Sequence, residues 1–238
     1  MPTVDHLLYD VFTDTPFAGN PLAVAIEPPA LDAMAMQRIA GELNLSETVF
    51  VRAAPGAGDA FTTRIFTPAT ELPFAGHPTI GAALALADEG LIGDRVVLRE
   101  GVGDVVVRIA AGVATLTTPV APAAVHVPPP DPDSLAGALG LSTDDLHPDT
   151  AHRWRARMFA PGFGIPEDPA TGSAAAAACG FLAALAPEQV DCGWQLEQGA
   201  EMGRPSIIDV GAVVEDERIV AATNGGRAVR IGRSTIEW

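Results

Sequence analysis

Two long segments of the sequence repeat one another, and no other feature restricts the fold as strongly. Residues 64–87, RIFTPATELPFAGHPTIGAALALA, correspond to residues 157–183, RMFAPGFGIPEDPATGSAAAAACGFLA. Each begins Arg-x-Phe-x-Pro, continues through a loop to a small residue, a glycine and a polar residue, and ends in an alanine-rich run typical of a helix. The first loop is three residues shorter than the second. An internal duplication is the simplest explanation of this match.

Strand and helix signals around the repeats predict an α+β fold. Short apolar runs with β-branched residues come in groups and are separated by turns, whereas a Rossmann fold would alternate strands and helices and carry a glycine-rich fingerprint after its first strand. The strands expected in the first half lie at 6–12, 21–27, 47–52 and 61–67, followed by an antiparallel meander over 95–119; helices are expected at 31–43 and from Pro78 to about Glu89. A second meander is expected after the second alanine-rich helix.

The duplication divides the chain into a first half-repeat, residues 1–119, and a second, residues 120–238. A proline-rich link at 120–133 joins them, because proline disfavours both helices and central strands. The second half is short: 63 residues precede Arg64 in the first half, but only 37 lie between the start of the link and Arg157. We therefore expect strands to be missing before residue 153, and sheet edges exposed there favour aggregation unless another chain covers them. Either a dimer partner completes the half-barrel, or the chain is a shortened natural or engineered variant.

In both repeats a glycine stands at the start of the alanine-rich helix. The first amides of a helix have no partner within it, so the amides at Gly76/His77 and at Gly172/Ser173 are suited to holding an anion. If the two halves face each other, these helix starts point into one cleft. Two such anion sites predict a small anionic substrate whose developing negative charge the amides would stabilise.

Polar side chains close to these glycines are the candidates for acid and base chemistry. His77 and Ser173 occupy matching positions of the repeat, Asp168 is placed in the longer loop of the second repeat, and Glu47 stands at the start of a predicted strand. Each has an ordinary structural explanation as well. Asp168 would be stabilised near the positive end of a helix dipole, and a histidine at a helix start is usually a cap or a surface group. A glutamate before a strand is usually solvated. Together, around a duplicated anion site, they favour general acid and base catalysis.

Charge and composition limit the partners of this chain. Its formal net charge is −16, with 14 basic residues against 30 acidic ones, which argues against nucleic acid because that partner requires clustered cations. There is neither an apolar run long enough for a membrane span nor a signal-peptide pattern, so we expect a cytoplasmic protein. Two cysteines, Cys179 and Cys192, form no cluster typical of a zinc site, and no metal is expected.

Five motifs resemble the PhzF-like phenazine-biosynthesis isomerase family. They are GNPLAV at 19–24, NLSETVFV at 44–51, RIFTPATELPFAGHPTIG at 64–81, RMFAPGFGIPEDPATGSA at 157–174 and QGAEMGRPS at 198–206. The resemblance implies a diaminopimelate-epimerase-like fold of two pseudo-symmetric halves, each a barrel-like, mostly antiparallel sheet around a central helix. It also implies a homodimer and a cofactor-free isomerisation of a dihydro-hydroxyanthranilate.

The resemblance further implies roles for individual residues. Glu47 would remove a proton from a ring carbon and return it, with His77 and Asp168 completing the catalytic set, and Gly76, Gly172 and Ser173 would bind the substrate carboxylate. Related two-base racemases use a cysteine at each helix start, which this sequence lacks. The alternative is a non-catalytic member that only binds small anions or another protein, which the short second half would favour.

Overall fold

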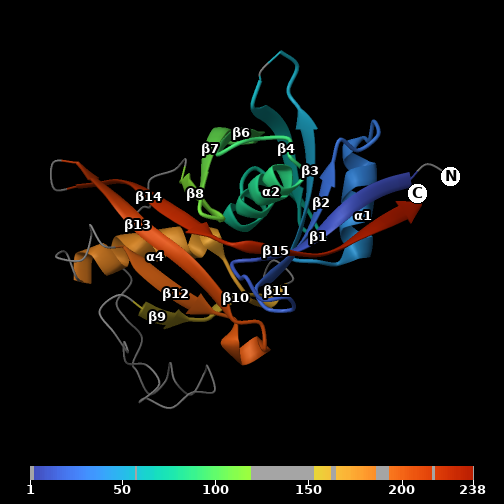
Figure 1. Ribbon diagram of the computed structural model, residues 1–238. Coiled ribbons are helices and arrows are strands. Elements are labelled where there is room, and N and C mark those ends of the chain that lie inside the picture. The colour runs from blue at the N-terminus through green and yellow to red at the C-terminus, as the bar shows by residue number, and fades with distance from the viewer. Residues whose placement is uncertain are drawn as a thin grey trace.

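A computed structural model describes residues 3–56, 58–118, 153–161, 165–185, 193–215 and 218–237 (Figure 1). Strands dominate, and all but two of them belong to a single sheet of 13 strands, while β10 and β11 form a separate pair. The strands are β1 (Thr3–Val11), β2 (Asn20–Ile26), β3 (Glu47–Ala53), β4 (Ala60–Phe66), β5 (Glu71–Leu72), β6 (Arg95–Glu100), β7 (Gly103–Ala110), β8 (Val113–Thr117), β9 (Arg153–Ala156), β10 (Met158–Ala160), β11 (Ile165–Asp168), β12 (Trp194–Gln198), β13 (Ser206–Glu215), β14 (Arg218–Gly226) and β15 (Ala228–Glu237). The α-helices are α1 (Ala33–Leu43), α2 (Gly76–Asp88) and α4 (Gly172–Leu185). The predicted α+β class is confirmed.

Helix α2 is the centre of the first half, with the strands curving around it in Figure 1. It contacts β1, β2, β3, β6, β7, β8, β14 and β15, and its residues from Gly76 to Leu86 are all buried. Alanine and glycine dominate this helix, so the surrounding strands can approach its backbone closely, while Ile80 and Leu86 fill the space between. Burial of each such large aliphatic side chain contributes roughly 1.5–3 kcal/mol.

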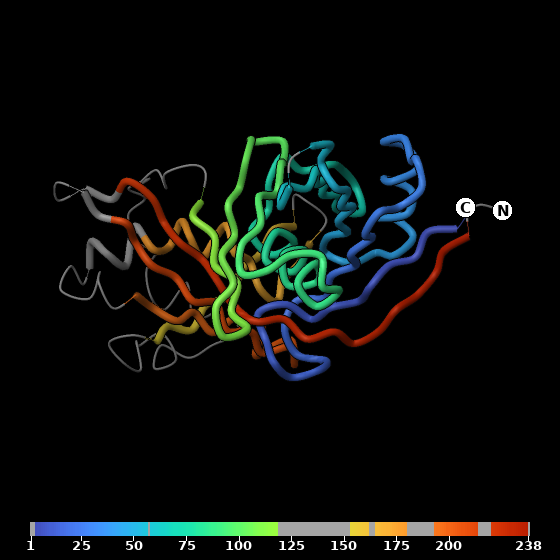
Figure 2. Tube along the Cα trace, turned by 45° about the horizontal axis from the view of Figure 1, so that its top comes forward, coloured from blue at the N-terminus to red at the C-terminus, as the bar shows by residue number. Residues whose placement is uncertain are grey.

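The last two strands close this arrangement. β14 and β15 are separated only by Arg227 and run as one long ribbon across the molecule (Figures 1 and 2). β14 pairs with β8, at the end of the first-half meander, and β15 pairs with β1. The chain therefore brings its final strands back to both edges of the sheet that surrounds α2.

Helix α4 packs on the second part of the sheet. It contacts β13 and β14, which pair with each other, and the sheet continues through β12 to β9. The predicted second meander is confirmed as the antiparallel series β12, β13 and β14. The predicted proline-rich link and the place of the missing strands lie outside the described residues, and the two pseudo-symmetric halves remain a prediction.

Helix α1 covers the outer face of β3 and β4, away from α2. Asp32 caps its start, where Oδ1 accepts a hydrogen bond of 2.8 Å from the Ala35 amide. Met36 and Ile39 of the helix pack with Phe50 and Phe66 of the strands in a small second core. Helix α1 was predicted at 31–43 and begins two residues later, whereas α2 begins two residues before the predicted Pro78.

The turn between β1 and β2 ends at Gly19, which has a φ of +66°. A Cβ atom at this position would lie 2.4 Å from the carbonyl oxygen of Val11, so only glycine fits. The turn delivers Asn20, the first residue of β2, to the middle of the molecule with an exposed fraction of 1%.

Candidate functional site

Glu47 and His77 meet at the start of α2. Glu47 is the first residue of β3, which pairs in parallel with β2, and His77 is the second residue of α2. The Nδ1 atom of His77 lies 2.8 Å from Oε2 of Glu47. The His77 side chain is 3% exposed, whereas that of Glu47 retains 14% of its exposure. The carboxylate is therefore partly accessible to solvent, whereas the imidazole is enclosed by protein.

The second nitrogen of His77 restricts the protons that this pair can hold. Nε2 lies 3.2 Å from the backbone carbonyl oxygen of Asn20, which can only accept a hydrogen bond, so Nε2 carries a hydrogen. One further proton then lies between Nδ1 and Glu47, bonded to one or the other. The pair is either two neutral groups or an imidazolium beside a carboxylate, and only the second form leaves Glu47 able to act as a base.

Asp168 is the last residue of β11 and is 6% exposed. Its Oδ1 accepts hydrogen bonds from Asn20 Nδ2 at 2.9 Å and from Ser46 Oγ at 3.2 Å, and the Thr171 hydroxyl donates to Oδ2. Burial raises the pKa of Asp168, and the negative charge of Glu47 acts in the same direction, while the bonds from Thr171 and Asn20 and the charge of His77 lower it. This environment suits a group that exchanges protons.

Gln198 of β12 fixes the backbone around Asp168. Its Nε2 donates to the Asp168 carbonyl oxygen at 2.7 Å and to the Thr171 hydroxyl at 3.1 Å, while its Oε1 accepts from the Thr171 amide at 3.3 Å. Because the Thr171 hydroxyl receives a hydrogen from Gln198, its own hydrogen is directed to Asp168. Gln198 therefore sets the orientation of the hydroxyl that touches the acid.

The starts of α2 and α4 are in contact. A Cβ atom on Gly172 would lie 3.3 Å from the Gly76 backbone, and one on Gly76 would lie 3.3 Å from Gly172. Among the described residues, no hydrogen bond from the amides of Gly76, His77, Gly172 or Ser173 is present. The amides of both helix starts are therefore available within one region, as an anion site requires. Ser173 itself is exposed.

In both repeats the arginine of the Arg-x-Phe-x-Pro sequence pairs with a glutamate and lies over the ring of the phenylalanine. In the first, Arg64 makes two hydrogen bonds to Glu71, of 2.7 and 2.6 Å, and its guanidinium lies 5.2 Å from the Phe66 ring centre. In the second, Arg157 makes two to Glu167, both of 2.8 Å, and lies 4.9 Å from the ring centre of Phe159. Each glutamate precedes the helix glycine by five residues. The extra residues of the second loop therefore lie before Glu167, and Asp168 ends a strand instead of lying in the lengthened part of the loop.

Arg204 ties the β1–β2 turn to the second half. Its guanidinium forms an ion pair with Asp10, which is fully buried, and donates to the carbonyl oxygens of Gly19 at 2.7 Å and Ala18 at 2.8 Å. Asp10 also accepts a hydrogen bond of 2.7 Å from the Phe17 amide. Arg204 thus stabilises the turn that carries Asn20.

The structure brings Glu47, His77 and Asp168 into one hydrogen-bonded network with the two helix starts. Sequence reasoning missed Asn20, which contacts Asp168 directly and also contacts His77, the partner of Glu47. It also missed Thr171 and Gln198. The position of Asn20 in the GNPLAV motif was the signal for it; Gln198 stands at the first position of QGAEMGRPS. Cys179 is buried within α4, and burial raises the pKa of its thiol to about 11, so it is not a base at the helix start.

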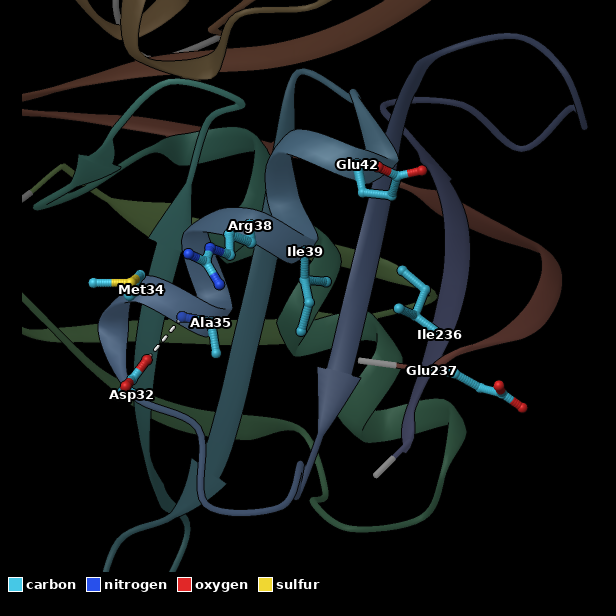
Figure 3. A pocket seen from close by; sticks show the side chains of 8 residues that line it. All are labelled: Asp32, Met34, Ala35, Arg38, Ile39, Glu42, Ile236 and Glu237. Carbon is cyan, nitrogen blue, oxygen red and sulfur yellow. Dashed lines mark hydrogen bonds between the residues drawn. The ribbon is translucent and has the colours of Figure 1, made fainter. Parts of the chain in front are cut away.

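A separate cavity lies on the other side of β3 and β4 from α2. It has a volume of about 650 Å³ and is formed by α1 and the end of β15 (Figure 3). Figure 3 shows its lining residues, which are Asp32, Met34, Ala35, Arg38, Ile39, Glu42, Ile236 and Glu237. None of the predicted site residues lines it. Among the described residues, no group of three or more His, Cys, Asp or Glu side chains is placed to hold a metal ion.

Comparison with known proteins gives the family. The family profile of phenazine biosynthesis-like proteins, PhzC-PhzF, matches residues 9–133 and 133–233, and the chain belongs to this family. The trans-2,3-dihydro-3-hydroxyanthranilate isomerase of Pseudomonas chlororaphis is 35% identical over 279 residues, which cover 97% of this chain and 98% of the relative. An uncharacterized isomerase of Mesorhizobium japonicum, mll1393, is 35% identical over 297 residues, with 97% and 98% covered. This chain is accordingly an isomerase of the PhzF type.

Solved structures agree in fold. A PhzF-family protein of Bacillus anthracis superposes with a TM-score of 0.86 at 21% identity, over all of both chains. A probable proline racemase of Agrobacterium radiobacter K84 superposes with a TM-score of 0.66 at 13% identity, over 98% of this chain and 93% of the other. The fold is therefore shared with racemases as well as with PhzF proteins. Of the helices in the described part of the chain, none is long and apolar enough to cross a membrane.

Proposed function

We propose that this protein shifts a proton between two carbon atoms of a small cyclic carboxylate similar to trans-2,3-dihydro-3-hydroxyanthranilate, without a cofactor. The observation that carries the proposal is the Glu47–His77 pair, with one proton between Nδ1 and the carboxylate, in the same network as Asp168. The names of relatives that are 33–35% identical over nearly their whole length support the substrate class.

In the proposed reaction, the Glu47 carboxylate removes a proton from a saturated ring carbon, and the electron pair of that C–H bond delocalises toward the substrate carboxylate. The amides of Gly76, Gly172 and Ser173 would hold that carboxylate and the charge that develops on it. Glu47 then returns a proton to a different carbon, so that no atom is gained or lost. His77 orients the Glu47 carboxylate through the 2.8 Å contact of its Nδ1 atom, and Asp168 orients the substrate or shares its protons.

Deuterium exchange tests this proposal. The protein is incubated with trans-2,3-dihydro-3-hydroxyanthranilate in deuterated water, and label and product are followed by NMR. We expect deuterium in the product with the unaltered protein and a loss of about 10²–10⁴-fold in rate for Glu47→Gln, which keeps the shape but cannot accept the proton. Glu42→Gln, on the exposed face of α1, is the control. Equal rates for Glu47→Gln and Glu42→Gln would refute the role of Glu47.

We also propose that the active form is a homodimer and that the protein is cytoplasmic. In this proposal each chain consists of half-repeats 1–119 and 120–238, and the second half-repeat is shortened. The alignment with mll1393 supports the shortening, since 297 aligned positions exceed the 238 residues of this chain and leave at least 59 positions without a counterpart. The two matches to the family profile meet at residue 133, within the proline-rich link. Light scattering coupled to size-exclusion chromatography tests the dimer, and a monomeric mass in the active fraction would refute it.

A further inference from the structure

Glu100, which takes no part in the proposed reaction, lies buried against the start of α2. It is the last residue of β6 and is 9% exposed. The turn that follows it packs on the loop before α2: the Val102 amide donates to the Pro73 carbonyl oxygen at 3.2 Å, and a Cβ on Gly101 would lie 2.8 Å from Pro73. Glu100 thus stands where β6 supports the segment leading to Gly76.

The hydrogen bonds of Thr79 define the protonation of Glu100. The Thr79 hydroxyl oxygen lies 2.7 Å from the carbonyl oxygen of Ala75 and 2.7 Å from Oε1 of Glu100. A hydroxyl has one hydrogen, and a carbonyl can only accept, so the Thr79 hydrogen is bonded to Ala75. The second short contact then needs a hydrogen from Glu100, because two acceptors at that distance repel one another. The geometry requires a neutral carboxylic acid.

The surroundings of Glu100 agree with a neutral group. Burial, which disfavours a charged carboxylate, raises its pKa to about 7. Glu100 contacts Thr79 of α2 and is paired in the sheet with Gly103 of β7, and the residue after it, Gly101, packs against Pro73 in the loop before α2. The nearest charged side chains along these strands, Arg99 and Asp104, pair with each other at 3.5 Å. In the described part of the chain, no cation pairs with Glu100.

We propose that Glu100 is a protonated acid that donates a hydrogen bond to Thr79 and, through Thr79 and Ala75, positions the first turn of α2. It is a positioning residue for the Gly76 amide and for His77, one residue further along. Its importance for turnover rests on the proposed function, since it acts only through these groups. Its protonation and its effect on the helix start do not depend on any substrate.

Thermal unfolding tests the protonation. Glu100→Gln keeps a donor for Thr79 but cannot ionise, and Glu42→Gln is the exposed control. Since the folded state favours the neutral acid, its contribution to stability declines as pH rises from the unfolded pKa through about 7. We expect Glu100→Gln to gain about 5 °C in melting temperature relative to the unaltered protein between about pH 5.5 and about pH 8.5. A difference that stays constant with pH, as for Glu42→Gln, would overturn the proposal.

Amide NMR and kinetics test the positioning. Glu100→Met fills the space but donates no hydrogen bond, so we expect it to shift the amide resonances of Gly76 and His77 and to lower kcat about tenfold with KM nearly unchanged. Glu100→Gln should restore both. Unmoved resonances in Glu100→Met, or no recovery in Glu100→Gln, would refute the role. The NMR and unfolding measurements use the protein alone, so a missing turnover with the chosen substrate would count against the proposed function only.

Discussion

The side-chain amide of Asn20 donates a hydrogen bond to Oδ1 of Asp168 over 2.9 Å, although 148 positions separate the two residues in the chain. The same amide donates to the carbonyl oxygen of Ala170 at 2.8 Å, and the backbone oxygen of Asn20 accepts from His77. One residue of the first half therefore sets the positions of the imidazole and of the buried acid. The geometry of the site depends on how these two parts of the chain come together.

Replacement of Asn20 by alanine removes both amide bonds. We expect a loss of about 1.5–3 kcal/mol in the free energy of unfolding, because a hydrogen bond to a charged group is lost inside the protein, and a lower kcat. Chemical denaturation and the deuterium-exchange assay measure the two effects. Ser46→Ala removes a longer bond to the same oxygen and should cost less. An Asn20→Ala protein as stable and active as Ser46→Ala would show that the hydrogen bonds from Asn20 to Asp168 and Ala170 do not support the site.

Asp168→Asn should change how stability depends on pH. The pKa of Asp168 is raised in the folded protein, so its stabilising contribution is complete below the unfolded pKa of about 3.9 and is lost as pH rises through the folded pKa. The variant cannot ionise, so the stability of the unaltered protein relative to it should decrease over this interval and then level off. Melting temperatures from about pH 3.5 upward measure this, with exposed Asp59→Asn as the control. Parallel curves for Asp168→Asn and the unaltered protein would rule out the raised pKa.

Arg204→Met should destabilise the protein strongly. It leaves the fully buried carboxylate of Asp10 without its ion-pair partner, and removal of one partner of a buried pair costs about 3–5 kcal/mol. Asp10→Asn added to Arg204→Met should recover part of this loss, because the unpaired charge is then absent. Denaturation of the two single variants and the double variant gives the coupling. Additive losses would show that the two side chains act independently.

Anthranilate should raise the melting temperature by binding to the amides at the two helix starts. At about 100 times its Kd, a ligand contributes about 2.7 kcal/mol to stability. Gly172→Ala should abolish the effect, since the added Cβ would lie 3.3 Å from the Gly76 backbone and separate the helix starts. Gly93→Ala is the control, because a Cβ there meets nothing within 4 Å. Equal stabilisation of both variants would place the anion elsewhere.

Much of the fold and part of the site follow from local sequence. The alternation of apolar residues in strands such as β6 and the alanine-rich run of α2 are local signals, and the repeat located both helix starts. The network around Asp168 is different in kind, because Gln198 and Asn20 reach it from distant strands whose pairing no local pattern reveals. The alternation of β6 places Glu100 on the same buried face as Val96 and Leu98, but its contact with Thr79 of α2 has no local signal in the sequence.

Strand β15 has a consequence for the order in which the protein can be assembled. Thr3 of β1 pairs with Glu237 of β15, and β14 pairs with β8, so the sheet around α2 needs residues from almost the whole length of the chain. During synthesis, the edges of β1 and β8 stay unpaired until β14 and β15 have left the ribosome. Pairing over such a separation is slow because a long loop has to close first. Closure of the sheet around α2 therefore depends on strands that follow all the candidate site residues in the sequence.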